Sequence, residues 1–192
     1  SILVAGLVTA AGAVWTRSAH VVGTALVVAS ALSLVAVNAR WIDAAAVSRR
    51  FVAAEAVWAR NSDPLLVALP DTLDGTLVDR NALHSSLALV HHWRDPYGAA
   101  YLATYEMGSP DVRVTVRPGP RPRTWTVRLD DPDASFSAVE GAGAPDVDGV
   151  TTTLTDPHGL LVVLDASVDP ERLWAFSGGR MLPWARTGPG AG

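Results

Sequence analysis

The sequence predicts a membrane-anchored α+β protein, and three observations carry that prediction. Residues 1–37 are almost wholly apolar, residues 42–60 have the spacing of an amphipathic helix, and short runs rich in β-branched residues follow from Asp111. We expect a transmembrane helical hairpin over 1–40 with a truncated first helix, a helical connector over 41–97, an antiparallel β domain (a meander or small sandwich) over 98–186, and a disordered tail over 187–192.

The N-terminal apolar block is divided by the polar segment Thr16-Arg17-Ser18. Between Arg17 and Arg40 no residue carries a fixed charge, and this stretch is long enough to cross the roughly 30 Å hydrocarbon layer as a helix. The part before Thr16 is too short to span alone, so we interpret it as the end of a first helix that turns at the polar segment.

Small residues recur at every fourth position of the second apolar stretch, at Ala25, Ala29 and Ser33. Because small side chains let helix backbones approach closely in lipid, this spacing favours packing against other transmembrane helices. The expected partners are therefore membrane lipid and other transmembrane subunits or helices.

Arginines predict the orientation in the membrane. Arg17 alone lies between the two expected helices, whereas Arg40, Arg49, Arg50 and Arg60 follow the second one. By the positive-inside rule the C-terminal domain lies on the cytoplasmic side of a multi-pass cell-membrane protein.

Composition excludes several classes of chemistry. The chain has 192 residues, a net charge of −4 and no cysteine, and all 15 basic residues are arginine. Disulfides, thiolate chemistry and every mechanism that needs a lysine are thus excluded, and nothing indicates a nucleic-acid surface. The absence of lysine fits a GC-rich bacterial genome. The segment from Asn38 to Asp43 resembles the ends of spans in some uncharacterised multi-pass bacterial membrane proteins, and this resemblance implies no function.

Residues 42–60 form the clearest helix after the apolar block. Val47, Phe51, Ala54 and Trp58 share one face, which either lies in the membrane interface or packs on the soluble domain. A second helix is expected over 77–93, with Leu83, Leu87 and Val90 on one face.

The C-terminal half contains short runs with the residue pattern of β-strands. We expect strands at 112–116, 124–129, 150–154 and 160–164. The turn Asp156-Pro-His-Gly159 joins the last two as a hairpin. Because Leu160–Leu164 is continuously apolar, we expect it to be the central strand of a meander, covered on both faces.

Two clusters could carry chemistry. His91 and His92, with Asp95 nearby and His84 two turns earlier, suggest a membrane-associated enzyme that uses a histidine as general base. The alternative interpretation is a helix end at which histidines cap the last carbonyls.

The second cluster crowds arginines onto one expected hairpin and suggests an anion- or lipid-binding module. The alternative is a structural role, in which a charged sheet edge blocks edge-to-edge pairing. The arginines are Arg113, Arg117, Arg121, Arg123 and Arg128.

The sequence predicts no metal or cofactor site and leaves the catalytic residues, if any, unknown. The function that it favours is therefore a non-catalytic, membrane-embedded subunit, or the C-terminal portion of a larger membrane protein or complex, acting in assembly or partner binding.

Overall fold

The structure is a computed structural model that describes residues 2–58, 63–78, 83–92, 99–137 and 147–184, with side chains from Ser18 onward. The chain divides into two compact units, Ser1–Trp41 and Ile42–Gly192. The first unit is helical, and the second contains the end of the long helix, one short helix, a 3-10 turn and all of the described strands.

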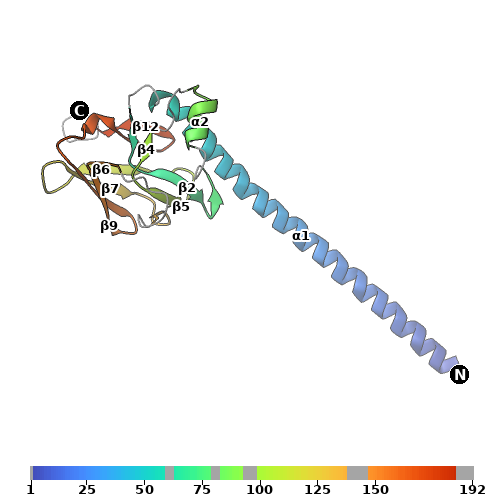
Figure 1. The fold of residues 1–192 in the computed structure, drawn as a ribbon. Coiled ribbons are helices and arrows are strands. Elements are labelled where there is room, and N and C mark those ends of the chain that lie inside the picture. The colour runs from blue at the N-terminus through green and yellow to red at the C-terminus, as the bar shows by residue number, and fades with distance from the viewer. Residues whose placement is uncertain (1, 59–62, 79–82, 93–98, 138–146, 185–192) are drawn as a thin grey trace. The chain divides into compact units, whose positions relative to one another are not determined.

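Helix α1 (Ile2–Trp58) begins in the first unit and ends in the second (Figure 1). It passes through Thr16-Arg17-Ser18 without a break, so the helical hairpin predicted over 1–40 is not formed. The segment contains neither Gly nor Pro, and Thr, Arg and Ser each cost a helix less than about 0.7 kcal/mol relative to Ala. Three polar residues therefore do not end a helix.

One helix among the described residues is long and apolar enough to cross a membrane. It is the part of α1 from Ser18 to Trp58, whose most apolar window has a mean hydropathy of 2.1 and is not buried by the rest of the protein. The structure thus retains one candidate span.

The C-terminal part of α1 packs on the folded unit through the predicted stripe. Val47, Phe51 and Trp58 are fully buried and Ala54 is half-buried, with Arg49 exposed on the other side. Of the two alternatives for the amphipathic face, the structure has packing on the folded unit rather than exposure to a membrane interface.

Sheet A has the strand order β12-β11-β1-β4. Strand β1 lies in its interior and is parallel to both neighbours, with Leu65 opposite Ala100 on one side and Leu173 on the other. The strands are β1 (Leu65–Leu66), β4 (Ala100–Tyr101), β11 (Leu173–Ser177) and β12 (Arg180–Pro183), and a 3-10 turn (Pro170–Arg172) precedes β11.

Sheet B has the order β3-β2-β5-β8, and its first two strands in the chain lie within the connector that was predicted as helical over 41–97. Strands β2 and β3 form a hairpin around Asp74-Gly75, which have positive φ angles of 47° and 73°. Asp-Gly suits such a two-residue turn, because Gly has no Cβ and Asp tolerates the left-handed region. The strands are β2 (Leu69–Leu73), β3 (Thr76–Leu77), β5 (Thr104–Met107) and β8 (Ser135–Phe136).

Sheet C has the order β6-β7-β10-β9 and is fully antiparallel (Figure 1). Its strands match the four predicted segments, and the strand that contains Leu160–Leu164 lies in the interior as expected. The outer face of that strand is only partly covered, since Leu161 and Val163 are half-buried. The strands are β6 (Val114–Pro118), β7 (Thr124–Leu129), β9 (Val150–Asp156) and β10 (Gly159–Leu164).

The predicted meander is wrong in its order. After β7 the chain leaves sheet C, and β8 pairs with β5 in sheet B. The chain returns as β9 at the far edge, and β10 then fills the place beside β7. Two hairpins are thus joined side by side, and parallel pairs in the other two sheets add contacts that a meander lacks.

Helix α2 (Leu83–Leu89) is shorter than the predicted helix over 77–93. Leu83 and Leu87 are buried as expected, but Val90 follows the helix and is exposed, and Leu77 belongs to β3. The connector therefore contains strands on the N-terminal side of one short helix.

Two hydrophobic clusters flank sheet A. Along β11, Leu173 and Ala175 belong to the larger cluster, which includes the inner face of sheet C, whereas Trp174 and Phe176 belong to the cluster of α1 and α2. Successive strand residues point to opposite faces, so β11 is covered on both sides. Sheet A is thus the middle layer of the folded unit.

Candidate functional site

The two histidines of the predicted cluster have different surroundings. His91 is half-buried, whereas His92 is exposed and has a positive φ of 51° just beyond α2. Asp95 lies outside the described residues. The structure therefore does not unite His91 and His92 in one pocket.

His91 instead belongs to a polar cluster that joins α1 to α2. Its Nε2 lies 2.7 Å from the carbonyl oxygen of Val52 and 3.7 Å from Oε2 of Glu55. Glu55 is fully buried on the stripe of α1. The hydroxyl of Ser86 lies 3.0 and 2.8 Å from the two carboxyl oxygens of Glu55 and 2.8 Å from the carbonyl oxygen of Leu83.

The hydrogen bonds of this cluster do not form a nucleophile and its base. A carbonyl oxygen only accepts, so Nε2 of His91 carries its proton toward Val52 and cannot accept one from a serine. The single proton of Ser86 is directed to Glu55 or Leu83, not to an imidazole. What the arrangement can do is satisfy a buried carboxyl group and hold α2 against α1.

His84 also bonds to the backbone. Its Nε2 lies 3.2 Å from the carbonyl oxygen of Ala99, the residue that precedes β4. The ring thus ties α2 to the start of the next strand, and because Ala99 lies outside α2 this contact is not the predicted cap on the last carbonyls of the helix.

Two of the five clustered arginines have structural partners. Arg123 donates to the carbonyl oxygens of Leu164, Asp165 and Val168, and so holds the loop after β10. Arg128 pairs with Asp156 across sheet C at 3.1 Å. These two side chains are engaged within the fold.

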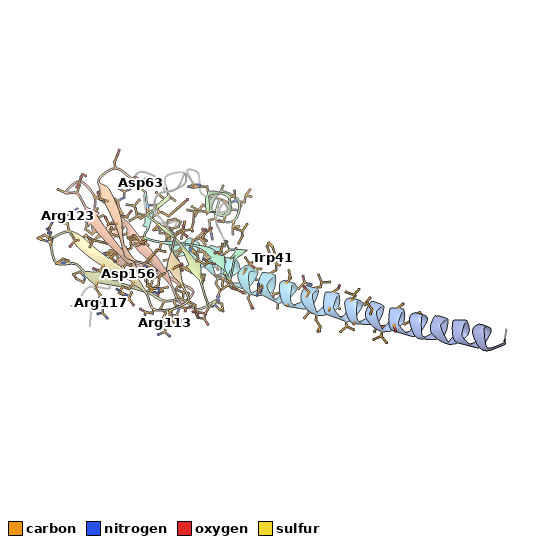
Figure 2. All side chains as sticks on the ribbon, turned by 90° about the horizontal axis from the view of Figure 1, so that it is seen from below. Trp41, Asp63, Arg113, Arg117, Arg123 and Asp156 are labelled. Atoms are coloured by element: carbon orange, nitrogen blue, oxygen red, sulfur yellow. The ribbon has the colours of Figure 1, made fainter. Side chains whose placement is uncertain are left out.

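The other three arginines project from the hairpin. Arg113, Arg117 and Arg121 are exposed, and their side chains make no ion pair or hydrogen bond with a described residue. Figure 2 shows Arg113 and Arg117 at the surface of the folded unit. These arginines are available to an anionic partner.

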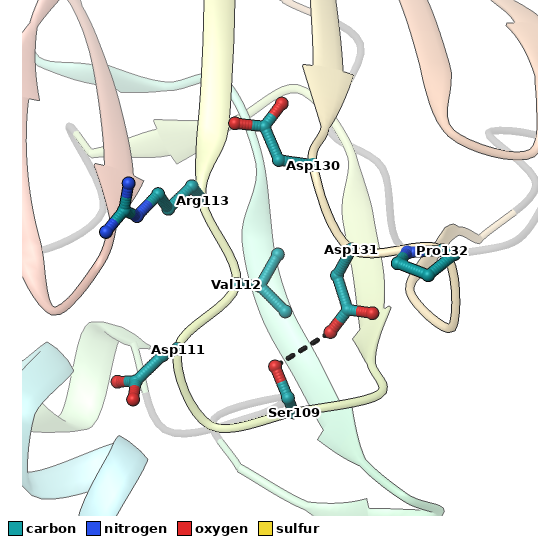
Figure 3. A pocket seen from close by; sticks show the side chains of 7 residues that line it. All are labelled: Ser109, Asp111, Val112, Arg113, Asp130, Asp131 and Pro132. Carbon is teal, nitrogen blue, oxygen red and sulfur yellow. Dashed lines mark hydrogen bonds between the residues drawn. The ribbon is translucent and has the colours of Figure 1, made fainter.

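A cavity of about 320 Å³ lies beside Arg113 (Figure 3). Its carboxylates have partners within the fold: Asp111 pairs with Arg50 at 2.7 Å, Asp130 accepts from Thr115, and Asp131 accepts from Ser109 at 2.8 Å. Because hydrogen bonds within the protein already engage these carboxylates, we interpret the cavity as a structural junction between loops and not as a binding site.

The described residues contain no group of three or more His, Asp or Glu side chains that could hold a metal ion. No known protein family, curated protein or solved structure matches the chain. The function must therefore be argued from this chain alone.

Sequence reasoning missed Glu55, although a signal was present. Glu55 follows Phe51 by four residues and precedes Trp58 by three, so it occupies the apolar stripe of its helix. An acidic residue at such a position predicts a buried carboxyl group with hydrogen-bond partners, because burial without them costs several kcal/mol.

Proposed function

We propose that this chain is a membrane-anchored, non-catalytic part of a larger membrane protein or complex. Helix α1 holds it in the bilayer, and the folded unit that begins at Ile42 binds partners. The observation that carries the proposal is the change of exposure along α1: every residue from Ser18 to Asp43 is exposed, whereas Ala44, Val47, Phe51 and Trp58 are buried.

The exposed part of α1 is too apolar to face water. Its Val and Leu side chains between Val21 and Val37 are 46–69% exposed. Burying each one is favourable by about 1.5–3 kcal/mol, and contiguous apolar patches of this extent mark a membrane or protein contact. The stretch from Ser18 to Asp43 is about 39 Å long as a helix, which exceeds the hydrocarbon layer of about 30 Å.

Other transmembrane helices are the partners that the exposed part of α1 suits. The small residues Ala25, Ala29 and Ser33 are all exposed and recur at the spacing that permits close helix approach. From the arginine bias we propose that the folded unit faces the cytoplasm, in an assembly whose other helices make it multi-pass.

Because the chain has no cysteine, one introduced cysteine would be the only thiol that a maleimide can label, and it can therefore test the orientation. We would introduce a single cysteine at the exposed Ser167 and treat intact cells with a membrane-impermeant maleimide. The proposal expects the chain to resist carbonate extraction and to be labelled only after the membrane is opened. Release by carbonate would contradict the anchor, and labelling of intact cells would contradict the orientation alone.

A second candidate function is recognition of anionic lipid by Arg113, Arg117 and Arg121. Their exposure, with no side-chain partner among the described residues, supports it, because arginine pairs well with phosphate oxygens. In mixed micelles, phosphatidylglycerol would raise the unfolding temperature of the full chain more than phosphatidylcholine does. Replacing the three arginines with Ala would remove this difference, and the control Arg180→Ala would keep it. A difference that survives the triple substitution contradicts this role.

A further inference from the structure

Strand β9 is an edge strand with an unpaired side, and its sequence does nothing to protect that side. It pairs with β10 on one side, and no described strand pairs with it on the other. From Val150 to Thr155 it carries no charge and no proline, and Leu154 is 39% exposed. A strand edge without charge or proline is a ready template for pairing with another strand.

The opposite edge of the same sheet is protected. The backbone N–H of Val114 in β6 donates to the hydroxyl of Ser177, and the carbonyl oxygen of Val112 accepts from Gly178. Pro118 then ends β6 within a proline- and arginine-rich segment. Prolines and charges are common means of blocking an edge, so the two edges of sheet C differ in kind.

The hydrogen-bond pattern identifies which backbone groups of β9 face outward. Asp165 N–H donates to the carbonyl oxygen of Gly149, and Leu164 N–H donates to Arg123 on the β7 side. Because hydrogen-bonded and non-bonded pairs alternate in an antiparallel ladder, Thr151 and Thr153 bond to β10. The N–H and C=O groups of Thr152 and Leu154 therefore point away from the sheet, and no described residue bonds to them.

We infer that β9 pairs antiparallel with β9 of a second copy of this chain, so that two copies of sheet C form one continuous sheet. The inference deepens the proposed partner-binding function, since anchoring in one membrane concentrates the copies. With Thr153 opposite its own copy, the outward groups of Thr152 meet those of Leu154 and form about four backbone hydrogen bonds.

Side chains favour this occupant over a strand of unknown sequence. In the self-paired register Thr151 lies opposite Thr155, Thr152 opposite Leu154, and Asp156 opposite Val150, so no like charges meet. Cross-strand Thr pairs are favourable, whereas like charges directly opposite are destabilising. The strand also matches its own length from Val150 to Asp156.

A disulfide at the symmetry axis tests the register. Thr153 would lie in a non-hydrogen-bonded pair with a Cα–Cα separation of about 4.5 Å, within the range for a disulfide, whereas Thr151 would be about 13 Å from its own copy. The full chain has no other cysteine. In mild detergent with an oxidant, we expect Thr153→Cys to form at least tenfold more linked dimer than Thr151→Cys, which is also exposed.

Three further variants distinguish strand pairing from chance collision of exposed cysteines. Thr152→Pro removes an outward N–H without removing a bond to β10, so added to Thr153→Cys it should abolish the linked dimer. Should that variant fold poorly by circular dichroism, Thr153→Arg and Thr153→Glu serve instead. Each alone should be monomeric by light scattering, and a mixture of the two should recover dimers.

Three outcomes overturn the inference: no linked dimer from Thr153→Cys, equal linking by Thr151→Cys, or no recovery in the mixture. Failure of the proposed anchor is distinguishable, because carbonate would then release the chain while the Thr153 disulfide still formed. A chain that resists carbonate but does not link contradicts the pairing and leaves the anchor intact.

Discussion

The two parts of α1, before and after Ala44, share a helix and a similar richness in Val and Ala, but their surroundings differ. From Ser18 to Asp43 every residue is exposed, whereas the later part buries Val47, Phe51, Glu55 and Trp58 along one stripe. The difference teaches that patterning, more than composition, decides where a helix finds its partner within the chain.

The physical reason lies in what each part can leave exposed. The later part carries Arg49 on its exposed side, so water can solvate that side while the apolar stripe is buried. The earlier part is apolar all round, so covering one face with the folded unit would leave the other faces in water. Lipid or further helices on all sides are the surroundings that suit it.

The largest effect is expected at the buried stripe. Phe51 is fully buried and meets the ring of Phe176 edge-on at 5.0 Å. Phe51→Ala should lower the free energy of unfolding of the folded unit by about 3–5 kcal/mol, as large-to-small changes in cores do. Denaturant titration followed by tryptophan fluorescence measures it. Leu32→Ala, in the exposed part of α1, is the control and should leave that free energy unchanged; a similar loss for both would erase the contrast.

In the exposed part of α1, introducing a charge should weaken membrane insertion, whereas shortening an apolar side chain should leave the fold unaffected. Val27 is 68% exposed, and Val27→Arg would cost about 2.5–3.5 kcal/mol of membrane insertion at the centre of a span. The fraction of the chain that resists carbonate extraction should fall, while the unfolding free energy of the folded unit stays the same. A drop in the latter with unchanged extraction would show that this part serves the fold and not the bilayer.

The polar cluster sharpens the comparison on the buried side. Ser86→Ala removes a donor from the buried carboxyl group of Glu55 and should cost about 1–3 kcal/mol of unfolding free energy. Ser85→Ala, at the exposed neighbouring position, should change it by less than about 0.5 kcal/mol. Equal effects of the two substitutions would mean that the hydroxyl at Ser86 contributes only through helix propensity.

The smallest effect is expected at Tyr105, in the large cluster beneath sheet C. Its hydroxyl is buried without a hydrogen-bond partner among the described residues, and burial raises the pKa of the phenol. Tyr105→Phe keeps the edge-on ring contact with Phe136 and should raise the unfolding free energy by up to about 1 kcal/mol. A loss of stability would indicate that the hydroxyl has a partner in the native protein.

The sequence predicted the elements whose pattern is local. Leu160–Leu164 is an interior strand because its continuous apolar run suits a strand with neighbours, and the stripe from Val47 to Trp58 is buried because its spacing is helical. Strands β2 and β3 were not predicted, because both are short and their residues show no clear alternation of apolar and polar side chains.

Other features could not be predicted because their causes are distant in the chain. Strand β1 has two residues, too few for any period, and it exists because Leu65 pairs with Ala100 and Leu173. Likewise, Ser86 meets Glu55 only after α2 has packed on α1. The predicted helical hairpin is absent for a local reason: the polar segment Thr16-Arg17-Ser18 contains no helix breaker, so α1 continues through it.

The central position of β1 has a consequence for the order in which the molecule can form. Contacts between Leu65 and Leu173 close a loop that contains most of the folded unit. Such non-local pairing slows folding, because the chain loses loop entropy before the contacts that stabilise the pair have formed. Until the residues of β11 have left the ribosome, Leu65 and Leu66 have no strand partner on one side. Both hydrophobic clusters then also lack the side chains that β11 contributes to them. A chain cut after Leu164 would therefore remain unfolded and prone to aggregation, even though every strand of sheet C would be present.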